Sequence, residues 1–370
     1  MKRTDFYQEI VNNIYMLGIK DLELIRKKIT GKEICDLADL LEEAIGYGIH
    51  SVTEKKRLAP SNDPHDYMST SIYHWPNPDT ADGLPYIHKD GVDNPEAIHG
   101  DKESLRTLAY ITYLSSLLYY LTLDDIYLDY ILKYNNFWFI DETTRMNPNL
   151  RYAQCIPGVN DGEPGGIIDY AASYSYALNM LTNLNKLKML PTTFVDGMKR
   201  WHNSFLEWLK TSEQGIIEGS RTNNQGALYD LLIINISNFL GKLEENKDLF
   251  YEKLLKRLEQ QIDDKGLLPL ELHRTKTKSY TTMALKMLLE AAYLLDDFDF
   301  SNNVKLLKAF KYIKNHYLNN TWEFMQIKSF DPYRGYYILI LFSKILNLKV
   351  EITFEKMEKH WGYILLPKLI

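Results

Sequence analysis

The chain has 370 residues, of which 45% are hydrophobic and 25% are charged. This composition supplies enough apolar side chains for a large core and argues against a disordered protein. The formal net charge of −6 argues against non-specific nucleic-acid binding, which needs an excess of basic residues. A polyanionic sugar remains a compatible partner, because a local basic cleft is sufficient to bind it.

The two cysteines, Cys35 and Cys155, lie far apart and lack the spacing of metal ligands. We therefore expect neither a disulfide framework nor a metal site, and no cofactor. The N-terminal stretch carries Asp5 and Glu9 where a signal peptide would have an apolar run. No segment approaches the roughly 20 apolar residues of a membrane span. The expectation is a soluble protein without a membrane partner, cytoplasmic as given, or secreted or periplasmic if the chain has been trimmed.

Apolar residues recur at helical spacing along most of the chain. The clearest segments are residues 34–45, 105–121, 170–184, 227–241, 280–295 and 333–346. Short breaks rich in Asp, Asn, Gly or Pro separate them, and few strands are expected. Helices of this length with short connections are typical of antiparallel helical hairpins, so the sequence predicts an all-α ring of helix pairs. We expect one domain over residues 1–370, with the helices of residues 1–50 packed on it.

Four segments depart from the helical pattern. Two are long, residues 59–95 and 141–169, and two are shorter, EGSRTNNQG at 218–226 and LELHRTKTKSY at 270–280. Long loops in a compact domain are usually functional. All four breaks carry arginine, asparagine, histidine or tyrosine, and arginines with neutral amides suit a carboxylate ligand that must be held and partly neutralised. The sequence therefore places the chemistry in these breaks.

The two shorter breaks contain the most specific candidates. Asn223 and Asn224 fall at the expected first turn of a helix, where free N–H groups and the helix dipole favour an anion. The alternative for Asn224 is simple N-capping. Arg274 precedes Tyr280 by a few residues, and a cation near a tyrosine lets the phenol act as a base or an acid. The alternative is a surface arginine and a tyrosine that faces the core.

The first long break also contains three histidines, His65, His74 and His88. They lack the tight pair spacing of metal ligands, so we expect them to be structural or to contact a sugar.

The long breaks contain DPHDY, WPNPD, DGLPYIHKDGVDNPE and, at residues 144–169, TRMNPNLRYAQCIPGVNDGEPGGIID. These motifs resemble those of the alginate-lyase-like polysaccharide lyases, a grouping whose members cut alginate or glucuronan. The resemblance covers about residues 51–295 and continues weakly to the C-terminus. It implies an (α/α) toroid, which is an incomplete or closed barrel of antiparallel helix pairs, with a cleft across one end.

The activity that this resemblance implies is β-elimination at a uronic acid of an acidic polysaccharide or oligosaccharide. Such an enzyme neutralises the carboxylate, removes the C5 proton with a base and protonates the O4 leaving group with an acid. By the family pattern, Asn224 and Arg274 grip the carboxylate and Tyr280 transfers protons. The family carries histidine where this chain has Gln225, and glutamine cannot accept a proton near pH 7.

This departure bears on the substrate. In mannuronate and glucuronate the C5 hydrogen and O4 lie on the same face, so one tyrosine can serve as base and then as acid. In guluronate and galacturonate they lie on opposite faces, and a second proton carrier is needed. We therefore expect a syn substrate, with Gln225 donating a hydrogen bond to the carboxylate. Alternatively, His65, His74 or His273 replaces the missing histidine.

Two other classes of function stay open at this point. One is a non-catalytic homologue that binds a uronate polysaccharide without cutting it, which Gln225 motivates. The other is a glycoside hydrolase on the same toroid, which needs two carboxylates beside the scissile bond. The carboxylates available in principle are Asp63, Asp66, Asp161, Asp169 and Asp230. We expect Asp66 and Asp169 to brace the loops through hydrogen bonds to backbone or arginine groups instead.

The remaining substrate contacts are expected from polar and aromatic side chains of the breaks. Aromatic rings such as Tyr73 and Trp75 would stack on a sugar face. Loop scaffolding is the alternative for each residue. The predicted substrate-binding residues are His65, Tyr73, Trp75, Arg145, Asn149, Arg151, Tyr152, Gln154, Arg221 and Asn223.

Overall fold

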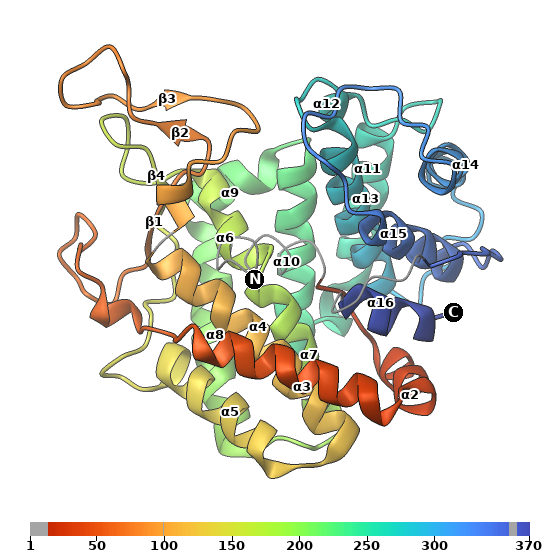
Figure 1. Cartoon of the computed structure of the whole chain (residues 1–370), viewed down its shortest axis with the longest axis horizontal. Coiled ribbons are helices and arrows are strands. Elements are labelled where there is room, and N and C mark those ends of the chain that lie inside the picture. Colours follow the sequence, from red (N-terminus) through yellow and green to blue (C-terminus); the bar gives the residue numbers. More distant parts are fainter. Residues whose placement is uncertain (1–13, 99, 355–360) are drawn as a thin grey trace. The chain divides into compact units, whose positions relative to one another are not determined.

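A computed structural model describes residues 14–98, 100–354 and 361–370. Helices dominate it, so the predicted all-α class is confirmed (Figure 1). The chain forms two compact units: unit 1 is Met1–Leu22 with Thr30–Glu218, and unit 2 is Glu23–Ile29 with Gly219–Ile370. A single domain over residues 1–370 stays a prediction, and the first 13 residues of its N-terminal part lie outside the described residues. Within the described ranges, no helix combines the length and the apolar character needed to cross a bilayer.

Unit 1 contains α3 (Gly31–Gly46), α4 (Asp101–Thr122), α5 (Asp125–Asn135), α6 (Ile168–Ala171), α7 (Tyr174–Lys186) and α8 (Thr192–Thr211). Helices α2 (Ile19–Lys28) and α9 (Glu213–Ser220) begin in unit 1 and end in unit 2. Unit 2 contains α10 (Asn224–Leu240), α11 (Lys247–Gln261), α12 (Pro269–Leu272), α13 (Thr277–Leu294), α14 (Val304–Leu318), α15 (Pro332–Ile345) and α16 (Trp361–Leu365).

Shorter elements complete the fold. The strands are β1 (Met68–Thr70), β2 (His74–Trp75), β3 (Ile87–His88) and β4 (Tyr152–Cys155). Single 3₁₀ turns are η1 (Val52–Glu54), η2 (Pro95–Ile98), η4 (Pro164–Ile167), η5 (Glu244–Asn246) and η6 (Leu366–Lys368), and η3 (Asn136–Ile140) is a π-helical turn. All four strands lie in the two long breaks of unit 1, as the loss of helical periodicity there indicates.

One of the six predicted helical segments is divided. Residues 170–184 were expected to form one helix, but the chain leaves the helical conformation at Ala172 and Ser173, between α6 and α7. Ser173 has φ −126° and ψ −81°, and its hydroxyl donates to the carbonyl oxygen of Asp169 at 2.5 Å. A serine hydroxyl that bonds to the backbone competes with the helical hydrogen-bond ladder, so periodicity alone overextends this helix.

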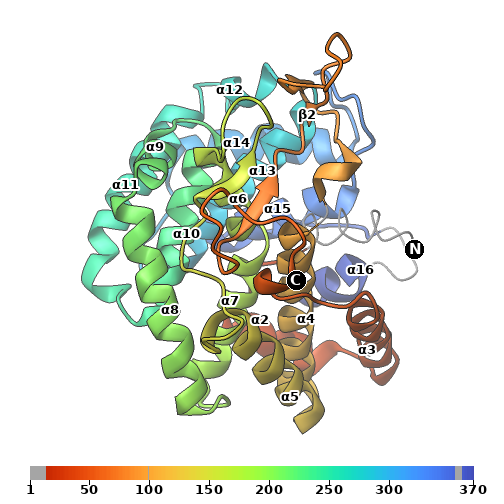
Figure 2. The ribbon, with the colours of Figure 1, turned by 90° about the vertical axis from the view of Figure 1, so that its left-hand side faces the viewer.

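Helix α4 forms the centre of unit 1. It packs against α3, α5 and α7 (Figure 2). Its side chains are buried along most of its length. The chain reverses from α4 to α5 through Leu123 and Asp124 alone. Leu123 takes the left-handed conformation with φ 60°, and the Asp124 carboxylate accepts from the first-turn N–H of Ile126 at 3.1 Å. This capping carboxylate starts α5 immediately after α4 ends.

A buried histidine lies in an aromatic cluster of unit 1. The His202 ring contacts Phe139, Tyr170, Tyr174 and Trp201. Its Nδ1 lies 2.8 Å from the carbonyl oxygen of Met198, and its Nε2 lies 2.6 Å from the Tyr170 hydroxyl. A carbonyl only accepts, so Nδ1 carries the hydrogen and Nε2 accepts from Tyr170. Burial lowers the pKa of His202 to about 4.

This pKa predicts that unit 1 loses stability in mild acid. Because the unfolded histidine titrates near its ordinary pKa of 6.5, the unfolded state binds more protons than the folded state between pH 6.5 and about 4. Through that window His202 costs about 1.4 kcal/mol of stability per pH unit as the pH falls. Urea unfolding at pH 7 and pH 5 should show a smaller acid loss for His202→Gln than for the wild type. The exposed His50→Gln should behave as the wild type, and equal losses in all three proteins would contradict the assignment.

In unit 2, α13 packs against α10, α11 and α15 (Figure 1). Helix α10 is buried on nearly all sides, begins after the capping residue Asn223 and ends at Gly241, whose φ is 77°. Helix α15 begins after the capping carboxylate of Asp331 with Pro332 in its first turn, where a missing N–H costs nothing. The residues in the first turns of α10 and α13 are therefore positioned by helices that are themselves largely buried.

The two long breaks of unit 1 form one structure. Strand β1 of the first break pairs in parallel with β4 of the second, with Met68 opposite Tyr152. Strands β2 and β3 form an antiparallel hairpin within the first break, with His74 opposite His88. Pairing across about 80 residues of sequence gives both loops a common backbone frame.

Candidate active site

In unit 2, the third break ends at the N-terminus of α10. The Asn223 side chain caps this helix by accepting from the backbone N–H of Gln225 at 3.2 Å. Asn224 is buried, and its backbone N–H donates to Glu271 Oε1 at 3.0 Å while its Nδ2 donates to Oε2 at 2.6 Å. The predicted helix start is confirmed. The anion at this N-terminus is the protein's own Glu271 carboxylate.

Glu271 links the two shorter breaks. It lies on α12, is 2% exposed and accepts Arg274 N–H at its backbone oxygen at 3.4 Å. Burial raises the pKa of Glu271, while the hydrogen bonds from Asn224 and the charge of Arg274 oppose that shift. Glu271 was not among the residues predicted for the site. A carboxylate three residues before Arg274, inside a functional break, is the signal that would have found it.

The third break is also fixed from α11. Buried Arg257 donates to Asp230 Oδ2 at 2.7 Å, to the Gly219 carbonyl at 2.7 Å and to the Arg221 carbonyl. A Cβ atom at Gly226 would lie 1.9 Å from the Arg221 carbonyl oxygen, so only glycine permits this close approach. The pattern of α11 gave no sign of the role of Arg257, because the residues that it holds lie more than 25 positions away in sequence.

Arg221 and Gln225 form a pair on this fixed turn. Arg221 Nη1 donates to Gln225 Oε1 at 2.5 Å, and both residues are partly exposed. Two of the predicted site residues are thus in direct contact, beside the helix start that Asn223 and Asn224 form.

Arg274 and Tyr280 form the second pair. Arg274 Nη2 donates to the Tyr280 phenol oxygen at 3.0 Å, and the guanidinium carbon lies 4.0 Å from the centre of the Tyr280 ring. Tyr280 lies in the first turn of α13 and is 8% exposed. A guanidinium that donates to a phenol oxygen stabilises the phenolate form. The predicted contact between these two residues is therefore present, and it suits a proton-transfer group.

In unit 1, the buried carboxylate of Asp169 holds the two long breaks together. It accepts from Tyr67 at 3.1 Å, Ser69 at 2.5 Å, Lys102 at 2.9 Å and Gln154 Nε2 at 3.1 Å. Burial alone would raise the pKa of Asp169, but the Lys102 ammonium and the Ser69 hydroxyl hold it below its ordinary value. The Gln154 side chain is therefore engaged in this frame.

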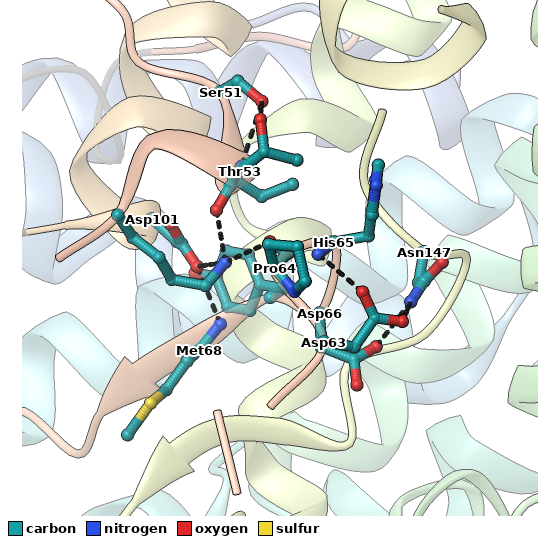
Figure 3. A network of polar contacts seen from close by, with 12 residues as sticks. Ser51, Thr53, Asp63, Pro64, His65, Asp66, Met68, Asp101 and Asn147 are labelled. Atoms are coloured by element: carbon teal, nitrogen blue, oxygen red, sulfur yellow. Dashed lines mark hydrogen bonds and ion pairs between the residues drawn. The ribbon is translucent and has the colours of Figure 1, made fainter. Parts of the chain in front are cut away.

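Asp63 and Asp66 organise the start of the first break (Figure 3). Asn147 Nδ2 donates to both carboxylates at 2.9 Å, and Asn149 Nδ2 donates to Asp66 at 3.3 Å. Asp66 and Asp169 brace the loops as expected, but the backbone and arginine partners predicted for them are wrong. Their partners are mainly side chains, since asparagine, serine, tyrosine, lysine and glutamine take the place of the expected backbone and arginine donors.

The same network is tied to the first turn of α4. Lys55 Nζ lies 3.0 Å from Asp101 Oδ2 and donates to the Pro64 carbonyl at 3.0 Å. The Met68 N–H donates to the same Asp101 oxygen at 2.9 Å (Figure 3). Burial raises the pKa of Asp101, and the Lys55 charge opposes this shift. This ion pair fixes the loop that carries His65 to a buried helix.

Two arginines stay exposed on the second break. Arg145 lies 3.7 Å from Glu142, and its carbonyl oxygen is 2.6 Å from His65 Nδ1. Arg151 lies with its guanidinium carbon 5.5 Å from the centre of the buried Tyr152 ring. Both guanidinium groups are exposed at the surface of unit 1, that of Arg145 beside the Glu142 carboxylate.

The hairpin of β2 and β3 carries the predicted aromatic residues. Trp75 donates from its indole N–H to the Val92 carbonyl at 3.0 Å, and Lys89 Nζ lies 5.1 Å from its ring centre. The Tyr73 ring contacts His88 edge-on at 6.4 Å. Both rings are partly exposed.

The structure thus gathers the predicted residues into two groups. In unit 2, Glu271 joins the turn of Arg221, Asn223, Asn224 and Gln225 to Arg274 and Tyr280. In unit 1, the linked long breaks carry His65, Tyr73, Trp75, Arg145, Asn149, Arg151, Tyr152 and Gln154. Among the described residues, no cluster of three or more His, Cys, Asp or Glu side chains could hold a metal ion. The catalytic roles of these residues stay predictions.

Comparison with known proteins identifies the class. The sequence model of the alginate lyase family matches residues 51–322. A crystal structure of an alginate lyase from Bacteroides ovatus is similar with a TM-score of 0.80 and 29% identity, over 90% of this chain and 91% of that one. A search of curated proteins found no match. The protein is a polysaccharide lyase, a class whose substrate here is an acidic polysaccharide. More specifically, the chain belongs to the alginate lyase family, as its loop motifs indicated.

The Glu271–Asn224 contact predicts a specific stability effect. In Glu271→Gln, the new amide nitrogen would face an N–H donor of Asn224, so one of the two hydrogen bonds is lost. Leaving a buried donor unpaired costs about 1–3 kcal/mol. Urea unfolding should show this loss, and the double variant Glu271→Gln/Asn224→Asp should recover most of it because the side-chain pairing is reversed. Glu252→Gln, on the exposed face of α11, is the matched control. A double variant no more stable than Glu271→Gln would contradict this pairing.

Proposed function

We propose that this lyase cleaves mannuronate- or glucuronate-type chains by syn β-elimination, with Tyr280 as both base and acid. The observation that carries the proposal is the contact between Arg274 and Tyr280, with a hydrogen bond of 3.0 Å and a guanidinium carbon 4.0 Å from the ring centre. A guanidinium beside a phenol oxygen favours the phenolate, which is the form that can accept the C5 proton.

Arg274 and the amides at the start of α10 neutralise the uronate carboxylate. Arg274 contributes the positive charge, and Gln225 contributes amide N–H donors. Asn224 uses one amide hydrogen on Glu271 and keeps its second for the substrate. Neutralising the carboxylate stabilises the enolate-like intermediate, and fixed donors do this without reorganisation at the moment of reaction.

In this reaction Tyr280 makes both proton transfers. The Tyr280 phenolate removes the C5 proton, and the electron pair of that bond forms the double bond between C4 and C5. The C4–O4 bond breaks, and the phenol gives the proton to the departing O4. Tyr280 returns to the phenolate, and the new chain end carries an unsaturated uronate.

Gln225 supports the restriction to syn substrates. An amide does not carry a proton between two faces of a sugar, whereas guluronate and galacturonate present C5–H and O4 on opposite faces. A site with one proton carrier therefore suits mannuronate and glucuronate.

In unit 1, we propose that Arg145 and Arg151 bind further uronate carboxylates of the polymer. Tyr73 and Trp75 provide partly exposed rings for sugar stacking, and His65 provides a hydrogen-bonding imidazole. Tyr152, Asn149 and Gln154 support this surface, since Asn149 and Gln154 donate to the bracing carboxylates.

The assay that tests the reaction follows the ultraviolet absorbance of the unsaturated product. Poly-mannuronate or glucuronan should give a rise, and poly-guluronate and polygalacturonate should give less. Tyr280→Phe should lower the rate roughly 10²–10⁴-fold, because it removes the proton-transfer group. Tyr293→Phe, on the same helix, is the matched control and should keep the wild-type rate.

Three outcomes would contradict the proposal. A faster reaction on poly-guluronate than on both syn polymers would refute the syn assignment. An unchanged rate in Tyr280→Phe would remove Tyr280 from proton transfer. Binding of the polymers without any absorbance change would identify a protein that holds uronates without cleaving them.

The unit 1 arginines are tested by steady-state kinetics. Arg145→Ala and Arg151→Ala should each raise KM about tenfold with a smaller effect on kcat, because a charge-assisted hydrogen bond contributes about 1.5 kcal/mol or more to binding. Arg200→Ala removes an exposed arginine from α8 of the same unit and should leave KM unchanged. If Arg145→Ala and Arg151→Ala keep the wild-type KM, as Arg200→Ala should, neither loop arginine binds the polymer.

A further inference from the structure

Arg221 lies against the position where the family carries histidine. Its Nη1 is 2.5 Å from Gln225 Oε1, across the turn that Asn223 caps. The two side chains are four residues apart in sequence, and both are partly exposed. The charge of Arg221 therefore affects which side chain is favourable at position 225.

Chemistry fixes the orientation of the glutamine amide in this pair. A guanidinium group only donates hydrogen bonds, so the atom of Gln225 that faces Arg221 must be the carbonyl oxygen. The Nε2 group then lies on the other side of the amide with its hydrogens directed away from Arg221. The pair presents donors to a ligand, one from a cation and one from a neutral amide.

The backbone beneath the pair is held in place. The Arg221 carbonyl accepts from buried Arg257, whose guanidinium is itself fixed by Asp230 and the Gly219 carbonyl. Gly226 packs directly against the same Arg221 carbonyl. Gln225 is fixed by its N–H bond to Asn223. Donors on a preorganised turn lose little freedom when they bind an anion.

We propose that Arg221 and Gln225 form a carboxylate clamp that replaces the family histidine and makes Arg221 a specificity-determining residue for uronates. This inference rests on the proposed function, because it places the uronate carboxylate at this turn. The clamp supplies charge and hydrogen bonds where a histidine would supply a proton. An imidazolium at position 225 would be repelled by the adjacent guanidinium, so a neutral donor is the residue that suits a site with Arg221.

The test measures the binding of mannuronate and glucuronate trisaccharides by calorimetry, in the Tyr280→Phe background to prevent turnover. Gln225→Glu keeps the size of the side chain and gains an ion pair with Arg221. The new carboxylate then occupies the Arg221 guanidinium in place of the substrate, and the amide N–H donors are lost. We expect an unchanged or higher Tm with a Kd at least tenfold weaker, and weaker than that of Gln225→Ala. Gln260→Glu adds the same charge on the exposed face of α11 and should bind as its parent does.

A double-mutant cycle tests whether the two residues act together. Arg221→Ala and Gln225→Ala should each weaken binding about tenfold, and the double variant should be weakened by well under the product of the two factors. Coupling is expected because Gln225 loses its orientation once Arg221 is removed. Fully multiplicative effects would show two independent residues and would overturn the clamp.

The remaining outcomes separate this inference from the proposed reaction. Equal affinities for Gln225→Glu and Gln260→Glu would overturn the clamp even when the wild type produces the absorbing product. A wild type that gives no product, but whose binding depends on the clamp, would overturn the reaction and keep the clamp. The clamp would also be overturned if the Tyr280→Phe protein bound neither trisaccharide.

Discussion

The pairing of buried Glu271 with Asn224 is the contact on which the unit 2 site depends. It places a carboxylate at the N-terminus of α10, where two N–H donors of Asn224 receive it. A helix N-terminus favours an anion, but here the anion is internal. The backbone N–H groups of Asn224 and Gln225 are therefore occupied by Glu271 and Asn223, and we propose that side chains neutralise the substrate carboxylate. In the reaction that we propose, Arg274 and the Arg221–Gln225 pair supply this charge and these donors.

Unit 1 uses its carboxylates in the same way. Asp169 and Asp66 receive donors from both long breaks, and Asp101 pairs with Lys55. Once these acidic groups serve as internal acceptors, the arginines of the second break remain at the surface. This arrangement explains how a chain with a net charge of −6 suits a polyanionic substrate. The bulk charge resides elsewhere, and the local field at the donors decides binding.

The features that could be predicted from the sequence are those that depend on neighbouring residues. Helical periodicity located the long helices and the start of α10, but the capping residue is Asn223 and not Asn224, for which capping was the alternative. The pair of Arg274 and Tyr280 is close in sequence and was found. Contacts between distant residues were missed: Glu271 lies 47 positions from Asn224, and Arg257 lies 36 from Arg221. Their positions carry no local signature, since a buried carboxylate or guanidinium reads as an ordinary polar residue of a helix. The break between α6 and α7 was missed for a related reason, because one serine hydroxyl decides it.

The departure at Gln225 is best understood together with its neighbours. A histidine in this place would have to gain and lose a proton beside a guanidinium, which opposes the charged form. The glutamine removes that conflict and keeps the hydrogen-bond donor. In the reaction that we propose, the loss of this proton carrier leaves Tyr280 to serve both the C5 proton and the O4 leaving group. We propose on this basis that the number of proton carriers in the unit 2 site sets the substrate range, and that the exposed arginines of the unit 1 loops affect how tightly the polymer is bound.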